Sequence, residues 1–310
     1  MKDLIILGNG MAGMTAALYA KRANLDFKIV GKDEFDFGQI GNAILVENFP
    51  CAASQSGMDL AMSLHNQLEA NDIKIEEHTV NKIMQMSDGI FSIYYEDGIV
   101  ELTKSIIYAL GARHKELNCK IEEGIPIHYC ALCDGSLYKN NNVVVIGGGD
   151  VAFTQAEYLS KICKNVCVLM CDENVTAASS TFDRVSKISN ITIKMNFPVG
   201  KISRSLNTTS YLYTLYEQSF CEKENGVGKA IRADGIFVAI GMIPNLEPIK
   251  FLSVKQSQMG IVATENGETE VSGFYVAGDV RMKNVRQGLT AAADGANAVN
   301  SVINYLKIQK

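Results

Sequence analysis

A ten-residue stretch near the start of the chain decides its fold: residues 4–13 read LIILGNGMAG. The apolar run Leu4–Leu7 has the length of a buried strand, and the glycines after it predict a tight turn into a helix from Ala12 to about Lys21. A second strand is expected at Phe27–Val30. This order is typical of a dinucleotide-binding unit, in which backbone amides at the helix N-terminus receive a pyrophosphate. A tight crossover turn without a ligand is the alternative.

The same order of elements returns in the middle of the chain. Residues 143–152 read VVVIGGGDVA, and a helix to about Cys163 and a strand at Val166–Met170 are expected after them. Two such units in one chain favour a flavoprotein with a second nucleotide-type domain. The alternative, that the second glycine turn only tightens a crossover between two strands, stays open.

A third segment with a polar end lies near the C-terminus. Residues 273–279 read GFYVAGD, which predicts a strand that ends in a turn of small residues with a carboxylate. Asp279 could accept hydrogen bonds from a ligand hydroxyl there. From Gln287 to about Leu306 the chain is rich in alanine, with apolar residues at helical spacing, so we expect a helix packed on the first domain. The positive end of its dipole would point at the cofactor.

Composition and charge exclude several classes of function. The chain has 310 residues, 47% apolar and 20% charged, which is typical of a globular protein with two domains of ordinary size. Its formal net charge of −5 gives no basic footprint for nucleic acid. No apolar run approaches the roughly 20 residues that cross a bilayer, and the first residues leave no room for a secretory signal. We therefore expect a cytoplasmic protein that binds neither nucleic acid nor a membrane.

Residues 130–135 read CALCDG and place two thiols at a spacing that lets them form a small reversible disulfide. Thiol exchange needs an attacking thiolate and a proton donor for the leaving thiolate, which Cys130, Cys133 and the adjacent Asp134 could supply. A zinc half-site and inert buried thiols are the alternatives. Zinc would need further ligands, and Cys167 lies inside an apolar strand where it is typical of a core residue. We expect no metal site.

From end to end the chain resembles the low-molecular-weight thioredoxin reductases. The stretches that carry the resemblance are Gly8–Gly13, Gly38-Gln39, Val46–Pro50, Ala109–Ala112, Cys130–Gly135, Gly147–Ala152, Ala239–Gly241, Pro244-Asn245, Gly278-Asp279 and Arg286-Gln287. The resemblance implies an α/β fold of two Rossmann-like, three-layer nucleotide-binding domains, the second inserted into the first. Residues 1–115 and 246–310 would form a discontinuous FAD-binding domain, and residues 116–245 a redox-disulfide domain with a degenerate pyridine-nucleotide-type fold. A homodimer is implied as well.

The resemblance also implies the roles of the site residues. Cys133 would face the flavin, Cys130 would attack the disulfide of the partner protein, and Asp134 would act as general acid and base. The residues that would hold FAD are Gly8, Asn9, Gly10, Met11, Ala12, Gly13, Lys32, Gly38, Gln39, Asn48, Val80, Ala109, Gly111, Gly278, Asp279, Arg286 and Gln287. Gly31 departs from the family pattern, because many flavoproteins place an acid for the ribose after the second strand. Lys32, Asp33 or Glu34 would substitute for it.

A second departure concerns the electron donor. NADPH-using members hold the 2′-phosphate with a histidine and arginines after the second strand of the inserted domain, but residues 170–176 here read MCDENVT. Each lost hydrogen bond to a charged group removes about 1.5–3 kcal/mol, and Asp172 and Glu173 would repel the phosphate. Residues 153–156 read FTQA, where pyridine-nucleotide-dependent relatives usually carry paired glutamates. These departures resemble the ferredoxin-dependent flavin thioredoxin reductases, which implies ferredoxin as donor and thioredoxin, or a thioredoxin-like protein, as acceptor.

The docking surface and three other functions are left as hypotheses. Arg281, Lys283 and Arg286 are candidates for a basic surface that binds an acidic ferredoxin; ordinary solvated surface, with Arg286 held by FAD, is the alternative. The chain could also be an NAD(P)H-dependent reductase with altered recognition, in which Asp172 reads the ribose of NADH. The two remaining hypotheses are a dithiol oxidase that gives electrons to oxygen and a redox-sensing FAD module that is not an enzyme.

Overall fold

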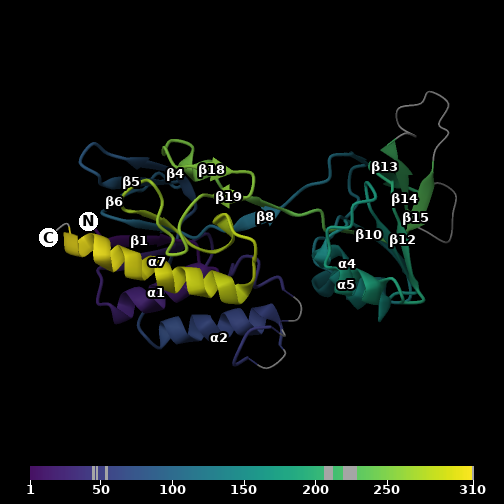
Figure 1. Ribbon diagram of the computed structural model, residues 1–310, viewed down its shortest axis with the longest axis horizontal. Helices are drawn as coiled ribbons and strands as arrows, with labels where there is room; N and C mark the ends of the chain where they lie inside the picture. Colours follow the sequence, from purple (N-terminus) through teal and green to yellow (C-terminus); the bar gives the residue numbers. More distant parts are fainter. Residues whose placement is uncertain (44–45, 47, 53–54, 206–211, 219–228, 309–310) are drawn as a thin grey trace. The chain divides into compact units, whose positions relative to one another are not determined.

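The computed structural model describes residues 1–43, 46, 48–52, 55–205, 212–218 and 229–308, apart from the side chains of Leu132 and Cys133. The chain forms two compact units, one of residues 1–113 and 243–310 and the other of residues 114–242 (Figure 1). It passes from one unit to the other along β8 (Ala112–His114) and returns along β17 (Met242–Pro244), and these two strands pair. The second unit is therefore an insertion in the sequence of the first.

The first unit is built on a five-stranded parallel sheet in the order β20-β7-β1-β2-β3. Its strands are β1 (Leu4–Leu7), β2 (Phe27–Gly31), β3 (Ile75–Glu77), β7 (Ile106–Tyr108) and β20 (Phe274–Val276). Alternate residues of β1 enter different cores, because successive side chains of a strand point to opposite faces. Leu4 and Ile6 belong to one core, and Ile5 and Leu7 belong to the other. Both faces are covered, and β1 is accordingly apolar throughout.

Helices cover one face of this sheet and a smaller sheet covers the other (Figure 1). The helices are α1 (Met11–Arg22), α2 (Gly57–Glu69) and α7 (Gly288–Ile308). The smaller sheet is antiparallel and contains β4 (Val80–Gln85), β5 (Phe91–Tyr95) and β6 (Val100–Thr103). The short elements are η2 (Glu247–Ile249), β18 (Gln256–Ser257), β19 (Gly260–Ile261) and η3 (Gly278–Val280).

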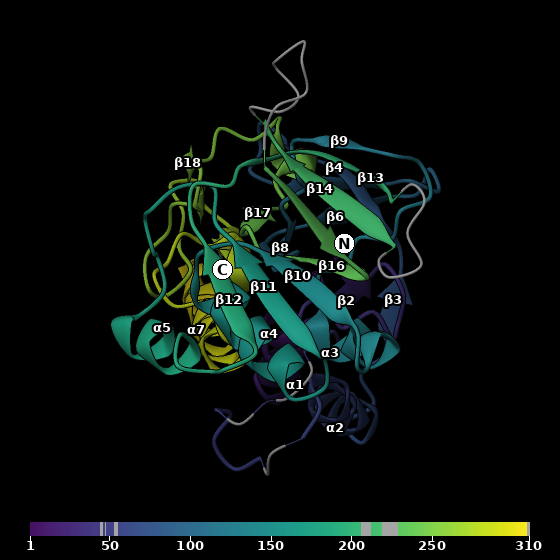
Figure 2. The same cartoon turned by 90° about the vertical axis from the view of Figure 1, so that its right-hand side faces the viewer.

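The second unit repeats this plan (Figure 2). Its parallel sheet runs in the order β12-β11-β10-β16, with β10 (Asn142–Ile146), β11 (Asn165–Leu169), β12 (Ile191–Lys194) and β16 (Gly235–Val238). Its helices are α3 (Ala131–Asp134), η1 (Gly135–Tyr138), α4 (Asp150–Ser160) and α5 (Ser179–Val185). The second sheet contains β9 (Lys120–Ile121), β13 (Val199–Arg204), β14 (Tyr213–Glu217) and β15 (Ala230–Ala233). Val144 of β10 shares a core with Ile202 and Leu215 of that sheet.

The predicted fold class is confirmed, since both units are α/β with a Rossmann-like parallel sheet between two covering layers. The two expected runs of strand, glycine turn, helix and strand are present. Helix α4 ends at Ser160 rather than near Cys163, because the amides of Lys161 and Ile162 donate to carbonyls three residues back and tighten the last turn. Within the described ranges, no helix has both the length and the apolar character needed to span a bilayer.

Candidate functional site

The first glycine turn is folded as tightly as its sequence predicts. Gly8 has φ +108°, and a Cβ there would lie 2.4 Å from the carbonyl oxygen of Ala109. At Gly13 a Cβ would lie 1.7 Å from the carbonyl oxygen of Gly8. Glycine is therefore required at both positions. Helix α1 begins after Gly10 without a side-chain cap, so its first amides are available to an anionic ligand.

Asn9 explains the glycine at the end of β2. Its amide nitrogen donates to the carbonyl oxygens of Asp33 at 2.8 Å and Glu34 at 3.2 Å, which ties the loop after β2 to the glycine turn. A Cβ at Gly31 would lie 2.5 Å from the side chain of Asn9. An acid at position 31 would collide with this amide. The departure at Gly31 thus follows from packing, and Lys32 beside it is exposed.

Asp279 Oδ1 is a buried acceptor atom on a partly exposed side chain. Asp279 follows β20 on the turn η3, and among the described residues no group donates a hydrogen bond to its Oδ1. Lys283 Nζ lies 3.8 Å from this oxygen, an ion-pair distance that is too long for a hydrogen bond. Burial raises the pKa of Asp279, while Lys283 and Arg286 oppose the rise and Asp294 adds to it. A ligand hydroxyl that donates here would satisfy the carboxylate.

Asp294 of α7 fixes the turn that carries Asp279. Its carboxylate accepts from the amide of Gly278 at 3.0 Å, from Arg281 Nη2 at 2.8 Å and from Lys283 Nζ at 2.9 Å. Asp294 lies on the buried face of α7 with Ala291, Gly295 and Ala298, so an acid on an apolar helical stripe was its signal in the sequence. Sequence reasoning missed it.

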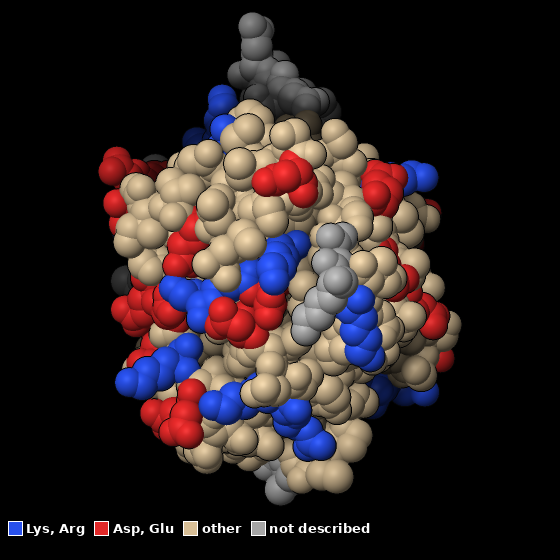
Figure 3. Space-filling view, turned by 90° about the vertical axis from the view of Figure 1, so that its left-hand side faces the viewer, with Lys and Arg blue, Asp and Glu red and all other residues tan. Residues whose placement is uncertain are grey.

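Two of the three cations considered for a basic docking surface, Arg281 and Lys283, are buried in ion pairs. Arg281 and Lys283 side chains are only 13% and 7% exposed, and both bind Asp294. Arg286 donates through Nη2 to the carbonyl oxygen of Met259, and among the described residues its buried Nε has no partner. On the face drawn in Figure 3, basic and acidic side chains alternate without a broad area of either sign. Arg281 and Lys283 bind the Asp294 carboxylate that fixes the turn, instead of forming a patch.

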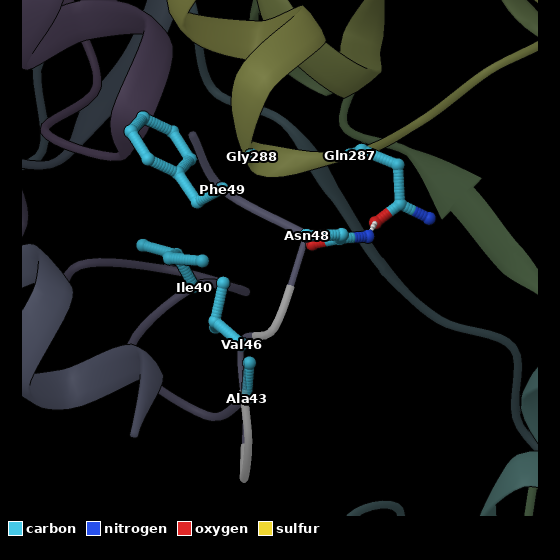
Figure 4. Close-up of a pocket in the computed structure, with 7 residues that line it drawn as sticks. All are labelled: Ile40, Ala43, Val46, Asn48, Phe49, Gln287 and Gly288. Carbon is cyan, nitrogen blue, oxygen red and sulfur yellow. Dashed lines mark hydrogen bonds between the residues drawn. The ribbon is translucent and has the colours of Figure 1, made fainter. Parts of the chain in front are cut away.

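A cavity of about 290 Å³ lies at the N-terminus of α7 (Figure 4). Its lining residues are Ile40, Ala43, Val46, Asn48, Phe49, Gln287 and Gly288. Asn48 Nδ2 donates to Gln287 Oε1 at 3.2 Å, so the structure brings together two residues predicted to hold FAD that are far apart in sequence.

The other residues predicted to hold FAD are spread around the first unit. Met11, Ala12 and Gly13 start α1, Ala109 and Gly111 follow β7, and a Cβ at Gly278 would lie 3.0 Å from the Cβ of Ala12. Gln39 Nε2 donates to the carbonyl oxygen of Ala112 at 3.2 Å. Lys32 and Gly38 are exposed and Val80 begins β4. None of these last three lines the described cavity.

The cysteine motif lies where β9 and the following loop lead into α3. Cys130 is disulfide-bonded. Five other cysteines are reduced thiols: Cys51, Cys119, Cys163, Cys167 and Cys171. Burial raises the pKa of Cys163 and of Cys167 to about 11, which makes them unreactive. The side chain of Cys133 and all of Cys221 lie outside the described part of the chain, so the pairing of Cys130 with Cys133 stays a prediction.

Asp134 follows the cysteine motif and contacts both Cys130 and His128. Its amide donates to the carbonyl oxygen of Cys130 at 3.2 Å, and its carboxylate lies 2.8 Å from His128 Nδ1. Sequence reasoning missed His128, which has no motif spacing. Among the residues that the structure describes, no group of three or more His, Cys, Asp or Glu side chains is arranged to hold a metal ion.

The loop after β11 is hydrogen-bonded to the second glycine turn. The carbonyl oxygen of Gly148 accepts from Thr176 N at 2.9 Å, from Thr176 Oγ1 at 3.2 Å and from Ala177 N at 3.2 Å. Ala178 N donates to Asp150 Oδ1 at 3.1 Å, in the first turn of α4. A Cβ at Gly149 would lie 3.3 Å from Thr176 Oγ1. These bonds attach the loop after β11 to the turn through a carbonyl oxygen and a carboxylate, and α4, like α1, begins without a side-chain cap.

The acids of this loop are held by their own neighbours. Asp172 Oδ1 accepts from Asn174 N at 2.7 Å, and this bond, with that from the Cys171 thiol, lowers the pKa of Asp172. Glu173 Oε1 accepts from Asn196 Nδ2 at 2.7 Å. Asp150, in the first turn of α4, is a third acid that contacts this loop.

Residues of the first unit fit FAD. The uncapped start of α1 suits a pyrophosphate, the orphaned Asp279 Oδ1 suits a hydroxyl, and the buried Arg286 Nε suits an acceptor. A tight glycine turn, a buried unsatisfied carboxylate and a cysteine motif in two Rossmann-like units define a nucleotide-binding disulfide oxidoreductase.

Comparison with known proteins agrees with this class. Residues 2–295 match the family of pyridine nucleotide-disulphide oxidoreductases, and the chain belongs to this family. A thioredoxin reductase of Mycoplasma genitalium is 34% identical over 97% of this chain and 94% of its own length. A 34.2 kDa protein in the rubredoxin operon of Clostridium pasteurianum is 34% identical over 98% of this chain and 97% of its own.

A solved structure supports the same conclusion. Thioredoxin reductase of Lactococcus lactis superposes with a TM-score of 0.87 at 28% identity, over 99% of this chain and 100% of that one. The chain is thus a thioredoxin-reductase-like flavin disulfide oxidoreductase of an FAD-binding family.

Proposed function

We propose that this chain reduces the disulfide of thioredoxin, or of a thioredoxin-like protein, through Cys130 and Cys133, with electrons from ferredoxin instead of NADPH. The observation that carries the choice of donor is the loop of residues 171–178, which bears two acids, contains no cation and is hydrogen-bonded to the second glycine turn. A cytoplasmic location and a homodimer belong to the same proposal. The homodimer is testable by sedimentation.

The exchange of thiols and disulfides balances without a further reactant. The Cys130 thiolate attacks one partner sulfur, forms a mixed disulfide and expels the other partner sulfur as a thiolate. The Cys133 thiolate then attacks Cys130 Sγ, which restores the intramolecular disulfide and releases the second partner thiolate. The two partner thiolates take up the two protons that the cysteines lost. Asp134 is the group that we assign to transfer them.

The residues of the first unit would hold the cofactor. The amides at the start of α1 would receive the pyrophosphate, Asp279 would accept from a hydroxyl, and Arg286 would donate from its buried nitrogen. Bound FAD supplies the chemistry that turns single electrons into the pair that a disulfide needs. These residues bind and orient it.

The energetics support a ferredoxin donor. A plant-type ferredoxin near about −400 mV that feeds thioredoxin near about −270 mV releases roughly 6 kcal/mol for two electrons. Without cations for the 2′-phosphate, the loss of two charge-assisted hydrogen bonds would weaken NADPH by roughly a hundredfold to ten-thousandfold. The free energy released by ferredoxin and the loss of NADPH affinity both favour a protein donor.

The test is anaerobic reduction of the purified, FAD-loaded protein by photoreduced ferredoxin, NADPH and NADH in parallel, followed by bleaching of the flavin. We expect ferredoxin to bleach it at least about a hundredfold faster than either nucleotide at equal concentration. Thioredoxin added afterwards should be reduced by the unmodified protein and by Cys163→Ser, which alters only a buried thiol. Cys130→Ser should abolish that step. Rapid bleaching by NADPH would refute the proposed donor.

A second candidate is an NAD(P)H-dependent thioredoxin reductase with altered recognition. It is favoured by the family's description as pyridine nucleotide-disulphide oxidoreductases and by relatives named thioredoxin reductase. Because one relative is named for a rubredoxin operon, reduced rubredoxin belongs in the same experiment as a further protein donor. Rapid bleaching by NADH or by NADPH would select the second candidate.

A further inference from the structure

His128 joins Asp134 to a buried tyrosine within the second unit. Its Nδ1 lies 2.8 Å from Asp134 Oδ2, and its Nε2 lies 2.7 Å from the hydroxyl oxygen of Tyr138. The imidazole is only 12% exposed. Its ring centroid lies 5.2 Å from that of Phe237 on β16. Both polar atoms of the ring are thus engaged, and the three side chains form one row.

The backbone holds His128 in place independently of its side chain. Its amide donates to the carbonyl oxygen of Ile236 at 3.0 Å, and its carbonyl oxygen accepts from Val238 N at 2.7 Å. These bonds attach the segment before the cysteine motif to the edge of β16. A substitution of the imidazole therefore leaves the main anchor of this segment intact.

The direction of the hydrogen bonds follows from the two ends of the row. Burial, and then the neighbouring Tyr213 and Asp134, raise the pKa of Tyr138. Its phenol keeps its proton and can donate to His128 Nε2 when this nitrogen carries none. The imidazole proton then resides on Nδ1 and is donated to the carboxylate of Asp134. Outside the row itself, Tyr213 is the titratable group that acts on Tyr138.

We propose that His128 is a positioning residue for the thiol exchange, which holds the carboxyl group of Asp134 in the orientation that serves the Cys130 motif. This rests on the role proposed above for Asp134 as proton donor to the leaving thiolate. Because His128 acts through Asp134, its effect should be confined to leaving groups that need a proton. The pH dependence of the exchange should change with it.

The experiment needs neither ferredoxin nor thioredoxin. FAD-loaded protein is reduced with dithionite, desalted under anaerobic conditions and mixed with hydroxyethyl disulfide from pH 5 to 9. His128→Ala should slow this reaction about tenfold at neutral pH, a fraction of the usual effect of a general acid. The loss should be confined to the part of the pH range in which Asp134 carries a proton, because only the protonated carboxyl group donates to the leaving thiolate. His128→Asn should restore most of the rate, since its amide can donate to Asp134 from the place of Nδ1.

Two comparisons separate positioning from packing. The aromatic disulfide dithiobis-nitrobenzoate expels a thiolate that leaves without a proton, so its rate should stay within about twofold in His128→Ala. In an Asp134→Asn background, His128→Ala should cause no further loss with hydroxyethyl disulfide. The control is Asp97→Asn, which breaks the similar pair of His78 and Asp97 in the first unit, 2.6 Å apart, and should change neither rate.

The proposal is overturned if His128→Ala reacts like the unmodified protein with both disulfides. It is also overturned if the losses in the double variant add, because additive losses indicate a packing role. Failure of thioredoxin to accept electrons, with the His128 effect on hydroxyethyl disulfide intact, would instead reject the proposed function and leave this inference standing.

Discussion

Asp279 and Asp294 are both acids of the first unit with buried carboxylate oxygens, but these oxygens have opposite surroundings. Asp294 accepts from an arginine, a lysine and a backbone amide, whereas Asp279 Oδ1 has no donor among the described residues. A buried carboxylate without a donor costs folding free energy, and one with several donors is held in place. At the scale of the residue, Asp279 is suited to bind a ligand, whereas Asp294 stabilises the structure.

Replacing Asp279 with Asn should stabilise the FAD-free protein and weaken FAD binding. The pKa of Asp279 is raised, chiefly by burial. Its contribution to stability is therefore present below the ordinary carboxyl pKa and is lost as pH rises through the raised folded value. Thermal melts of Asp279→Asn and of the unmodified protein should agree in acid and diverge in favour of the variant towards neutral pH. FAD, titrated by fluorescence quenching, should bind about ten- to a hundredfold more weakly.

Asp294→Asn is the matched control for this prediction. It leaves Arg281 and Lys283 buried without their anion, so the FAD-free protein should lose stability, by about 3–5 kcal/mol for a broken buried pair. If both variants shift the melting temperature in the same direction at neutral pH, the contrast between the two acids is incorrect.

At the scale of the element, the contact between α1 and α7 sets the position of the first glycine turn. A Cβ at Gly295 would lie 2.2 Å from the carbonyl oxygen of Ala12, which is backbone and cannot turn away. Gly295→Ala should therefore destabilise the protein by about 1–3 kcal/mol, although alanine favours helix by about 1 kcal/mol over glycine. FAD binding should weaken as well, because Ala12 belongs to the turn.

The check is chemical denaturation of Gly295→Ala beside Ala293→Leu, which enlarges an exposed residue of the same helix. The exposed change should leave the midpoint nearly unmoved. Equal midpoints for both variants would show that the two helices separate freely and would contradict this packing argument.

The elements show why part of this molecule could be predicted from the sequence. The turns at Gly8–Gly13 and Gly147–Gly149 were predictable because their chemistry is local: strand, turn and helix are neighbours in the chain. The contacts that other segments make with these turns were not predictable. The sequence of residues 170–176 does not indicate that Thr176 donates a hydrogen bond to the carbonyl oxygen of Gly148, 28 residues earlier.

The same limit applies to the candidate site. Arg281 and Lys283 look like surface cations in the sequence, and only the packing of α7 brings Asp294 against them. His128 meets Asp134 because β16 fixes the segment before α3. The motif residues were predictable and their partners were not, since partners depend on contacts between distant elements.

At the scale of the whole molecule, each unit has its own hydrophobic core. In the described part of the chain, two clusters contain residues of 1–113 and 243–310, and a third contains residues of 114–242. Units with separate cores can unfold separately. A ligand of one unit should then stabilise that unit more than the other.

FAD should raise the melting temperature of one of two calorimetric transitions. At a hundred times its dissociation constant, it adds about 2.7 kcal/mol to the unit that binds it. The shifted transition should be the one that Gly295→Ala lowers, and the other should be moved by a destabilising change such as Val144→Ala in the core of the second unit. A single transition that moves as a whole would show that the units unfold together.

The order of segments in the chain also affects how the protein is made. Strand β20 and helix α7 complete the first unit, yet residues 243–310 leave the ribosome after the inserted unit. At about 5–20 residues per second, the inserted unit is fully synthesised some seconds before its host can close. During that interval the edge of β7 that later pairs with β20 has no neighbour, so the nascent chain exposes an unpaired strand that chaperones can recognise.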